Sequence, residues 1–235
     1  MKDLRNIKFF QWYYKNATQF FQPIFGVKRQ KEFYEWLFWL IQKFKEKRLN
    51  NAHYEPFFTT YFGLSLDYYK DKKVLDIGCG PRGSLEWANN TCERIGLDTL
   101  ADKYVKLEGK HHQMTYKNAP AESIPYPDNY FDVISSFNSL DHVDDLQQSI
   151  REIKRVLKKG GYFLLIADIH DHATICEPSA FDWNIIHIFK PELTIIEEHH
   201  YEGNLMYKSI REAKVFDHTN LKSRYGILTA KFQKL

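Results

Sequence analysis

Apolar and polar residues recur with two different periods along the chain, and the change falls near residue 72. Before it, apolar residues follow the three- and four-residue spacing of a helix, most clearly over Lys31–Arg48. After it, short apolar runs such as Lys73–Ile77 alternate with amphipathic stretches. Strands that alternate with helices are typical of a parallel, doubly wound sheet. The sequence therefore predicts an N-terminal helical segment followed by an α/β domain.

The N-terminal segment is aromatic as well as helical. Four apolar residues share one face of the helix predicted over Lys31–Arg48, namely Phe33, Leu37, Leu40 and Phe44. Further aromatic and aliphatic residues widen this face at mid-helix, so we expect burial on more than one side. An earlier helix is expected over Phe9–Phe21, ending before Pro23.

The α/β part is expected to hold seven strands. They are predicted over Lys73–Ile77, Glu93–Leu97, Gln113–Tyr116, Tyr130–Ser135, Tyr162–Ala167, Leu193–His200 and Gly226–Phe232. Helices are predicted over Ser84–Asn90, Leu100–Leu107 and Leu146–Leu157, the last ended by a turn at Gly160-Gly161. The last two strands could pair antiparallel at the sheet edge. We predict a doubly wound, mostly parallel seven-stranded sheet with helices on both faces, and a division into a cap (residues 1–70) and a main domain (residues 71–235).

Composition indicates a globular chain with a sizeable core. The 235 residues are 43% hydrophobic and carry a net charge of +3, too close to balance to indicate nucleic-acid binding. Residues 1–48 nevertheless hold 11 Lys/Arg against 4 Asp/Glu, a local net charge of +7. The three cysteines form no disulfide framework, and no apolar run suits a signal peptide or a membrane span. We therefore expect a cytoplasmic protein.

Three glycines follow the first predicted strand. Gly78, Gly80 and Gly83 have the G-x-G-x-x-G spacing, which lets a backbone turn tightly and approach a ligand. Asp98 lies 20 residues after Gly78, at the end of the second predicted strand, where a carboxylate can accept both hydroxyls of a ribose. Its alternative role is to cap the next helix. The glycine loop favours the ribose contact and hence a nucleotide-like cofactor.

The glycine loop and Asp98 belong to a set of four ordered motifs within residues 72–168. The motifs are Val74–Gly80, Gly96–Asp98, Ala121–Asp128 with Phe131–Ile134, and Glu152–Gly161. In order and spacing, this set resembles the class I S-adenosylmethionine-dependent methyltransferases of the small-molecule type. The later motifs differ from those of nicotinamide dehydrogenases. The resemblance implies a Rossmann-like fold, S-adenosyl-L-methionine as cofactor, and an enzyme that transfers a methyl group.

The resemblance also implies roles for residues in the first two motifs. Asp76 would orient the loop and the amino-acid end of the cofactor. The backbone of Gly78, Cys79 and Gly80 would pack against the methionine part, and Asp98 would hold the ribose hydroxyls. These five residues are our predicted cofactor-binding residues from this half of the site.

The later motifs supply the remaining implied contacts. Ala121 and Glu122 would lie beside the adenine, and Ser136, Phe137 and Asn138 would face the sulfonium and the substrate. Two positions depart from the family pattern. Pro120 stands where many relatives have an acid, so the adenine amino group either lacks a carboxylate partner or uses Glu122. Many relatives have a Leu-His-His run where this chain has Leu140-Asp141-His142. Asp141 thus stands in place of the first histidine, and His142 remains as the candidate.

Methyl transfer to a hydroxyl or a protonated amine needs a general base. We expect this base just after the fourth or fifth strand, because residues at the carboxyl ends of parallel strands reach the ligand crevice. The predicted catalytic residues are His142, His170 and His172, and the predicted substrate contacts are Asn138, Asp168 and Glu177. For the run Asp168–His172, three interpretations stay open: a base or substrate contact, a divalent-metal site with Asn138, and a solvated loop. We favour the first and predict no metal.

The resemblance implies that the N-terminal extension lies over the acceptor site. An aromatic, basic cap of this kind favours a small and acidic acceptor. We therefore predict methyl transfer to an oxygen or nitrogen nucleophile of a small metabolite, with no nucleic-acid partner. The alternatives are a lipid-like acceptor at a membrane surface, which we do not favour, and a non-catalytic cofactor-binding scaffold protein.

Overall fold

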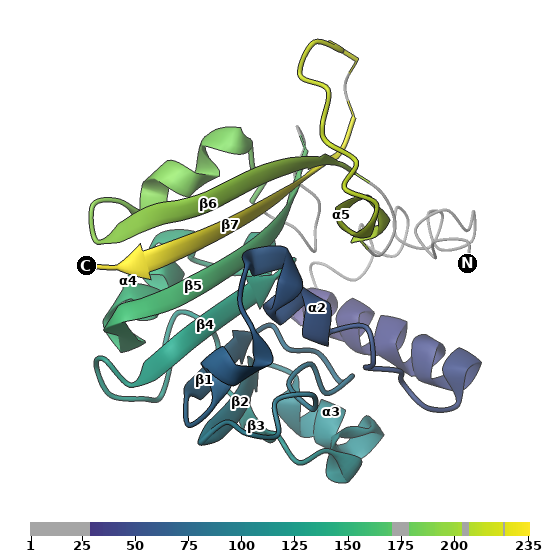
Figure 1. The fold of residues 1–235 in the computed structure, drawn as a ribbon. Coiled ribbons are helices and arrows are strands. Elements are labelled where there is room, and N and C mark those ends of the chain that lie inside the picture. The colour runs from purple at the N-terminus through teal and green to yellow at the C-terminus, as the bar shows by residue number, and fades with distance from the viewer. Residues whose placement is uncertain (1–28, 171–178, 204–206, 223) are drawn as a thin grey trace.

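The computed structural model describes residues 29–170, 179–203, 207–222 and 224–235, which form one sheet with its covering segments (Figure 1). The seven strands lie in the order β3-β2-β1-β4-β5-β7-β6. Their bounds are β1 Lys73–Ile77, β2 Glu93–Asp98, β3 Thr115–Asn118, β4 Phe131–Phe137, β5 Leu157–Ile169, β6 Leu193–Glu202 and β7 Gly226–Lys234. Strands β1 to β5 pair in parallel, and β7 runs antiparallel to both β5 and β6. The predicted fold class is confirmed, including the antiparallel pairing of the last two strands.

The helices are short except for one near the N-terminus. They are α2 Glu55–Phe58, α3 Ala101–Leu107, α4 Leu146–Val156 and α5 Lys208–Arg211, with 3-10 turns that include η5 Leu140–His142 and η6 Trp183–Phe189. The chain is also helical over residues 29–46, and this helix lies beyond the ends of the strands in Figure 1. We call it the roof helix. The helix predicted over Phe9–Phe21 lies outside the described residues.

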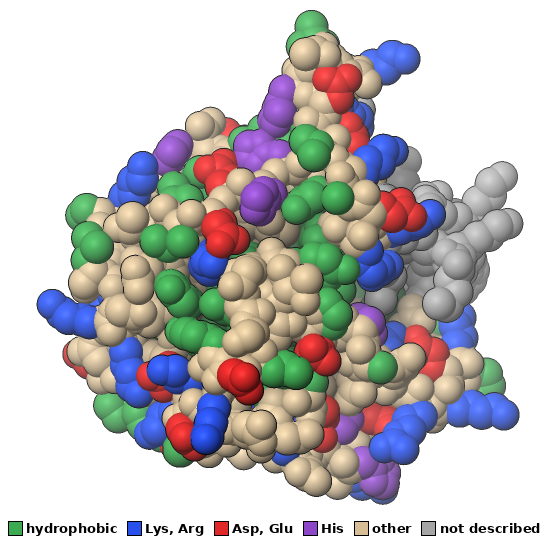
Figure 2. Space-filling model, in the orientation of Figure 1, with side chains coloured by type: hydrophobic (Ala, Val, Ile, Leu, Met, Phe, Trp, Pro, Cys, Tyr) green, Lys and Arg blue, Asp and Glu red, His purple; other side chains and the backbone are tan. Residues whose placement is uncertain are grey.

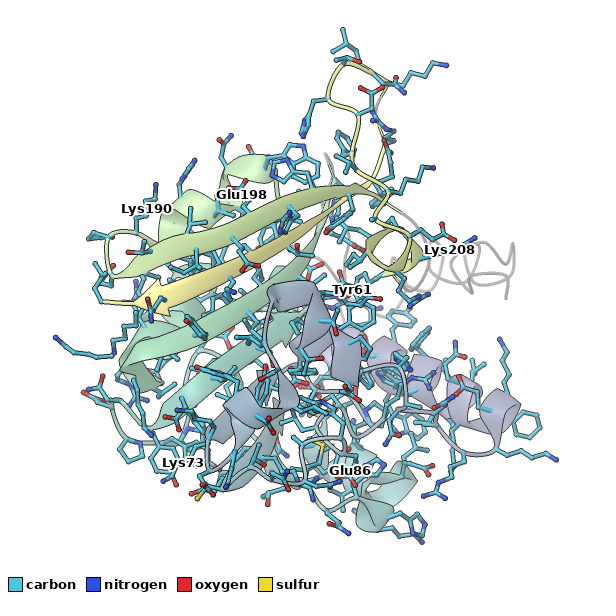
Figure 3. The ribbon with its side chains drawn as sticks, in the orientation of Figure 1. Tyr61, Lys73, Glu86, Lys190, Glu198 and Lys208 are labelled. Carbon is cyan, nitrogen blue, oxygen red and sulfur yellow. The ribbon has the colours of Figure 1, made fainter. Side chains whose placement is uncertain are left out.

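Each face of the sheet has its own core, because successive strand residues point to opposite faces. Toward α4 and η6 the three central strands contribute Leu75, Ile134 and Leu165. Toward the other face they contribute Val74, Val133 and Leu164, packed with Phe57, Phe58, Phe62 and Tyr69. Tyr61 lies beside Phe57, with ring centroids 5.1 Å apart (Figure 3). The aromatic segment of residues 54–69 thus covers one face of the sheet. The predicted division at residue 70 stays a prediction.

The helix predicted over Ser84–Asn90 is wrong: these residues form turns. Side chains there bond elsewhere instead of supporting a helix. The Ser84 hydroxyl donates to Asp76, and the Glu86 carboxylate accepts the backbone N–H groups of Gln113 and Met114 at 2.9 and 2.8 Å (Figure 3). Such bonds compete with helix formation. A stretch this short also forms too few helical hydrogen bonds to offset the free-energy cost of helix nucleation.

The predicted turn at Gly160-Gly161 is also wrong, since α4 ends at Val156 and both glycines lie within β5. The pairing of β4 with β5 shifts register between Phe131 and Val133, opposite this stretch. Gly160 has φ +73°, a conformation that a β-carbon disfavours. The glycines therefore accommodate an irregularity in β5 and do not cap the helix.

The roof helix is oriented differently from what its apolar stripe indicates. Phe33, Leu40 and Phe44 are exposed, and Phe44 is 88% accessible. Tyr34 is buried instead. The rotation of this helix is set by polar and aromatic contacts with the loops beneath it, described below, and not by its apolar stripe.

Candidate active site

A cavity lies at the carboxyl edge of the parallel strands, between the sheet and the roof helix. Gly78 after β1, Asp98 at the end of β2 and Asn138 after β4 form part of its sheet side. Glu35 and Lys31 of the roof helix line its other side. The strand order reverses between β1 and β4, and ligands of doubly wound sheets bind at such a switch point.

Of the glycine loop, Gly78 lines this cavity. Gly78, Gly80 and Gly83 have φ +69°, +56° and +77°, the left-handed region that favours glycine. A β-carbon built on Gly78 would lie 2.2 Å from the Ser139 β-carbon. The Gly78 N–H donates to the Leu97 carbonyl at 2.8 Å, which ties the loop to β2. The missing β-carbon of Gly78 therefore lets Ser139 pack directly against the loop at the cavity wall.

Asp76 and Cys79 lie beneath the loop and not in the cavity lining. The Asp76 carboxylate accepts the hydroxyls of Ser84 and Ser135, the latter at 2.6 Å. Burial raises the pKa of Asp76 to about 6, against the opposing effect of the two hydroxyl donors. Cys79 is buried against Gly96, and burial raises the pKa of its thiol. Asp76 thus acts on the loop from below.

Asp98 lies in the cavity wall with its carboxylate tied to backbone. One oxygen accepts the Leu100 N–H at 2.9 Å and the other accepts the Gly80 N–H at 3.3 Å. Burial raises the pKa of Asp98 to about 6, although these two donors lower it. The carboxylate bridges the glycine loop and the start of α3, and each of its oxygens has a backbone donor.

The loop after β3 lines the cavity with Pro120, Ala121 and Glu122. One oxygen of the Glu122 carboxylate accepts the backbone N–H groups of Asp144 and Asp145 at 2.7 and 2.9 Å. Those bonds hold the loop before α4. Because this oxygen already has two donors, Glu122 serves foremost as a brace for the loops around the cavity.

Only one of the three residues predicted after β4 faces the cavity. Ser136 is buried and shares a hydrogen bond of 2.5 Å with Ser139. Phe137 packs on Phe58, with centroids 4.7 Å apart, on the aromatic face of the sheet. Asn138 lines the cavity with φ +52°, and its buried Oδ1 has no hydrogen-bond partner among the described residues. A ligand donor would satisfy this oxygen.

His142 is the predicted histidine that reaches the cavity. It lies in η5, and its Nε2 is 3.8 Å from a carboxylate oxygen of buried Asp141. Its backbone carbonyl accepts the Lys31 ammonium of the roof helix. The Lys31 ammonium also lies 3.4 Å from Asp144. An imidazole backed by a carboxylate is a suitable arrangement for a general base.

His170 and Asp168 lie elsewhere at the same sheet edge. His170 is buried, its ring centroid is 5.4 Å from that of Tyr225, and it is not among the described residues that line the cavity. Burial raises the pKa of Tyr207 and the nearby carboxylates of Asp168 and Asp141 add to the effect, so these groups lie close together. The predicted residues His172 and Glu177 lie outside the described residues.

Two ion-pair networks and one aromatic contact hold the roof helix over the loops. Arg82 of the glycine loop donates to both oxygens of Glu46, at 2.8 and 2.6 Å, and to the Asn50 carbonyl at 2.9 Å. Lys43 pairs with buried Glu108 at the end of α3. The Trp39 ring lies against Gly80, where an added β-carbon would be 3.2 Å from it. These contacts place the inner face of the helix on the cavity.

Among the residues of this wall that sequence reasoning missed are Lys31, Glu35 and Ser139. Glu35 had a signal, because it is an acid within the most apolar part of a helix, between Tyr34 and Trp36. Lys31 and Ser139 had none, since a lysine at a helix start and a serine in a loop are ordinary.

Two further searches bear on function. Among the described residues, no group of three or more His, Cys, Asp or Glu side chains is arranged to hold a metal ion. Within those same residues, no helix is both long enough and apolar enough to cross a membrane.

The strand order and the glycine loop are typical of Rossmann-like domains that bind nucleotide cofactors. Comparisons with known proteins indicate which of these domains the chain resembles. A family profile described as "Methyltransferase domain" matches residues 75–165. The uncharacterized methyltransferase YcgJ of Bacillus subtilis (strain 168) is 33% identical over 103 residues, 41% of this chain and 40% of that protein. The malonyl-[acyl-carrier protein] O-methyltransferase of Enterobacter lignolyticus (strain SCF1) is 36% identical over 90 residues, 38% of this chain and 36% of that protein.

A solved structure extends the similarity of the fold. The crystal structure of YcgJ superposes with a TM-score of 0.54 and 18% identity, over 75% of this chain and 99% of that one. The chain spans about two fifths of the length of the curated relatives it matches. Over residues 75–165 the chain is thus similar to methyltransferase domains.

Proposed function

We propose that this protein binds S-adenosylmethionine and transfers its methyl group to an oxygen or nitrogen nucleophile of a small molecule. The supporting observation is the cavity in which the Gly78 backbone, the Asp98 carboxylate and the unpaired Oδ1 of Asn138 come together. Bare backbone, a carboxylate and an amide oxygen suit the donor groups of a nucleoside with an amino-acid tail. When bound, S-adenosylmethionine would supply a methyl group bonded to a positively charged sulfur.

The residues present fit this cofactor. Asp98 would hold the ribose hydroxyls, and the glycine loop would approach the amino-acid part. Asn138 would accept a hydrogen bond with its unpaired Oδ1. Pro120 and Ala121 lie on the wall where the family places the adenine, and Glu122 braces that wall through backbone N–H groups.

We assign the role of general base to His142. It lines the cavity, whereas His170 packs toward Tyr225. The Asp141 carboxylate near its Nε2 would favour the protonated imidazole once a proton has been accepted. The chain itself would mainly align the two reactants and exclude water, and the roof helix is placed for that purpose.

The acceptor is proposed to be a small molecule. The roof helix lines one side of the cavity and the loops at the sheet edge line the other, which suits a small molecule. On the face drawn in Figure 2, basic and acidic side chains are interspersed, unlike the one-signed surface of a nucleic-acid binder. The cavity lining includes Glu35, Asp98 and Asp144. Its acidic side chains favour a neutral or basic acceptor over the acidic one expected from the charge of residues 1–48.

The first test is a calorimetric titration of the full chain with S-adenosylmethionine, followed by turnover with a panel of amines, alcohols and acids, measured as S-adenosylhomocysteine release. We expect saturable binding and turnover with members of the panel. Absence of binding would disprove the proposal. In the same assay, His142→Gln should lower kcat by roughly 100-fold, as for loss of a general base, and His170→Gln should leave it within a factor of about three. The reverse result would disprove the base assignment.

A further inference from the structure

The roof helix carries a half-buried carboxylate on its cavity side. Glu35 lines the cavity together with Gly78 and Asp98. One of its oxygens accepts the Trp39 indole N–H at 2.9 Å, one helical turn further on. Trp39 in turn lies against Gly80 of the loop. Glu35 is therefore held in place by the residue that docks the helix on the glycine loop.

The charges around Glu35 leave the cavity short of cations. Burial raises the pKa of Glu35; His142 and Lys31 lower it, and Asp98 raises it further. The Lys31 ammonium, its neighbour on the same helix, is occupied by the His142 carbonyl and lies near Asp144. Facing Glu35 from the sheet is Asp98, whose own pKa is raised by burial. Two half-buried carboxyl groups thus line the same cavity, whose lining has more acidic than basic side chains.

A cavity with two half-buried carboxyl groups and more acidic than basic side chains attracts a positively charged ligand, because that ligand relieves the unfavourable desolvation of negative charge. S-adenosylmethionine carries a sulfonium, an ammonium and one carboxylate, a net charge of +1. The product S-adenosylhomocysteine has a neutral thioether and a net charge of zero. The two ligands differ in charge and one methyl group, and are otherwise identical.

We propose that Glu35 makes this cavity discriminate between the two ligands, binding the sulfonium form more tightly than the neutral thioether. The inference rests on the proposed function. When the cationic ligand is bound, Glu35 is ionised and opposes its positive charge. When the methyl group leaves, the bonding electron pair stays on sulfur and that attraction disappears. The product is then held less tightly than the cationic ligand, so Glu35 favours product release.

The proposal predicts that Glu35→Gln changes the two affinities unequally. Glutamine keeps the size of the side chain and an oxygen that can accept the Trp39 N–H, but it lacks the charge. Calorimetric titration of the full chain should show about a tenfold loss of S-adenosylmethionine affinity, as for loss of one charge-assisted interaction. The affinity for S-adenosylhomocysteine should change by less than about a factor of two. Glu35→Asp keeps the charge and should retain most of the preference.

The matched control is Glu46→Gln, three turns along the same helix and outside the cavity lining. It weakens the Arg82 anchor and should lower both affinities by the same factor, because it loosens the helix without changing the charge in the cavity. If Glu35→Gln also lowers both affinities equally, or changes neither, Glu35 does not discriminate and the inference is wrong. If the wild-type chain binds neither ligand, the proposed function itself fails, and the inference with it.

Discussion

The two sides of the cavity are built in different ways. On the sheet side, backbone hydrogen bonds fix the groups: the Gly78 N–H on Leu97, and two N–H groups on the Asp98 carboxylate. On the helix side, side chains do so: Arg82 with Glu46 and Lys43 with Glu108. A wall fixed by backbone bonds is encoded locally, whereas a wall held by pairs distant in sequence depends on the whole fold.

The difference also separates what each side can do. The sheet side offers fixed groups to the constant parts of a cofactor, such as a ribose and an adenine. The helix side is held by two side-chain pairs, Arg82 with Glu46 and Lys43 with buried Glu108, so its position depends on residues of other segments. We therefore expect the sheet side to set affinity for the cofactor, and the helix side to set the response to its charge and to the acceptor.

The largest expected effect is on the sheet side. Asp98→Ala should weaken S-adenosylmethionine binding by roughly 100-fold, since hydrogen bonds to a charged group contribute about 1.5–3 kcal/mol each and 1.4 kcal/mol is tenfold in affinity. Calorimetric titration measures this loss. The control is Asp102→Ala, an exposed acid of α3 that binds Asn118 and does not line the cavity. Equal affinities for the two variants would contradict the ribose assignment.

The contrast between the two walls explains what could be predicted from sequence. The strands were predictable because their apolar runs are local, and Gly78 and Asp98 because their spacing is fixed by a strand, a turn and a strand. Glu35 was not, since only the rotation of the roof helix brings it to the cavity. That rotation follows from partners such as Arg82 and Glu108, far from Glu35 in sequence, and it leaves the most regular apolar stripe exposed.

The missed and mistaken local elements have a similar cause. The stretch after the glycine loop has helix-forming residues, yet Ser84 and Glu86 bond to Asp76 and to the backbone before β3. The sequence Gly160-Gly161 after α4 is typical of a helix cap. In the structure both glycines lie in β5, opposite a register shift in its pairing with β4. In both places a tertiary contact overrides a local preference, and no periodicity in the sequence reports such a contact.

An intermediate effect concerns Asp76 beneath the loop. Its folded pKa of about 6 lies above the ordinary aspartate value of about 3.9, so the folded chain holds this proton more tightly than the unfolded chain. Stability from this group is therefore present below about pH 4 and is lost as pH rises to about 6. Asp76→Asn removes that dependence. The free energy of unfolding of the variant relative to wild type should rise by about 2–3 kcal/mol between pH 4 and pH 7.

Urea unfolding of both proteins at pH 4, 5, 6 and 7 measures this difference. Asp98 titrates in the same range and with the same sign, but it is present in both proteins and cancels in the comparison. A difference that stays constant from pH 4 to pH 7 would mean that Asp76 is not desolvated beneath the loop. The sheet side would then be less rigid than its hydrogen bonds indicate.

The smallest expected effect is on the outer face of the roof helix. Phe44 is 88% exposed, so Phe44→Ser should change the free energy of unfolding by less than about 0.5 kcal/mol. Tyr34, 5% exposed on the inner face of the same helix, is the matched comparison, and Tyr34→Ser should cost about 3 kcal/mol. Urea unfolding again measures both. A loss above about 1 kcal/mol for Phe44→Ser would show that the exposed stripe is covered in solution. Dependence of that loss on protein concentration would identify a second copy of the chain as the cover, because only an intermolecular contact varies with concentration.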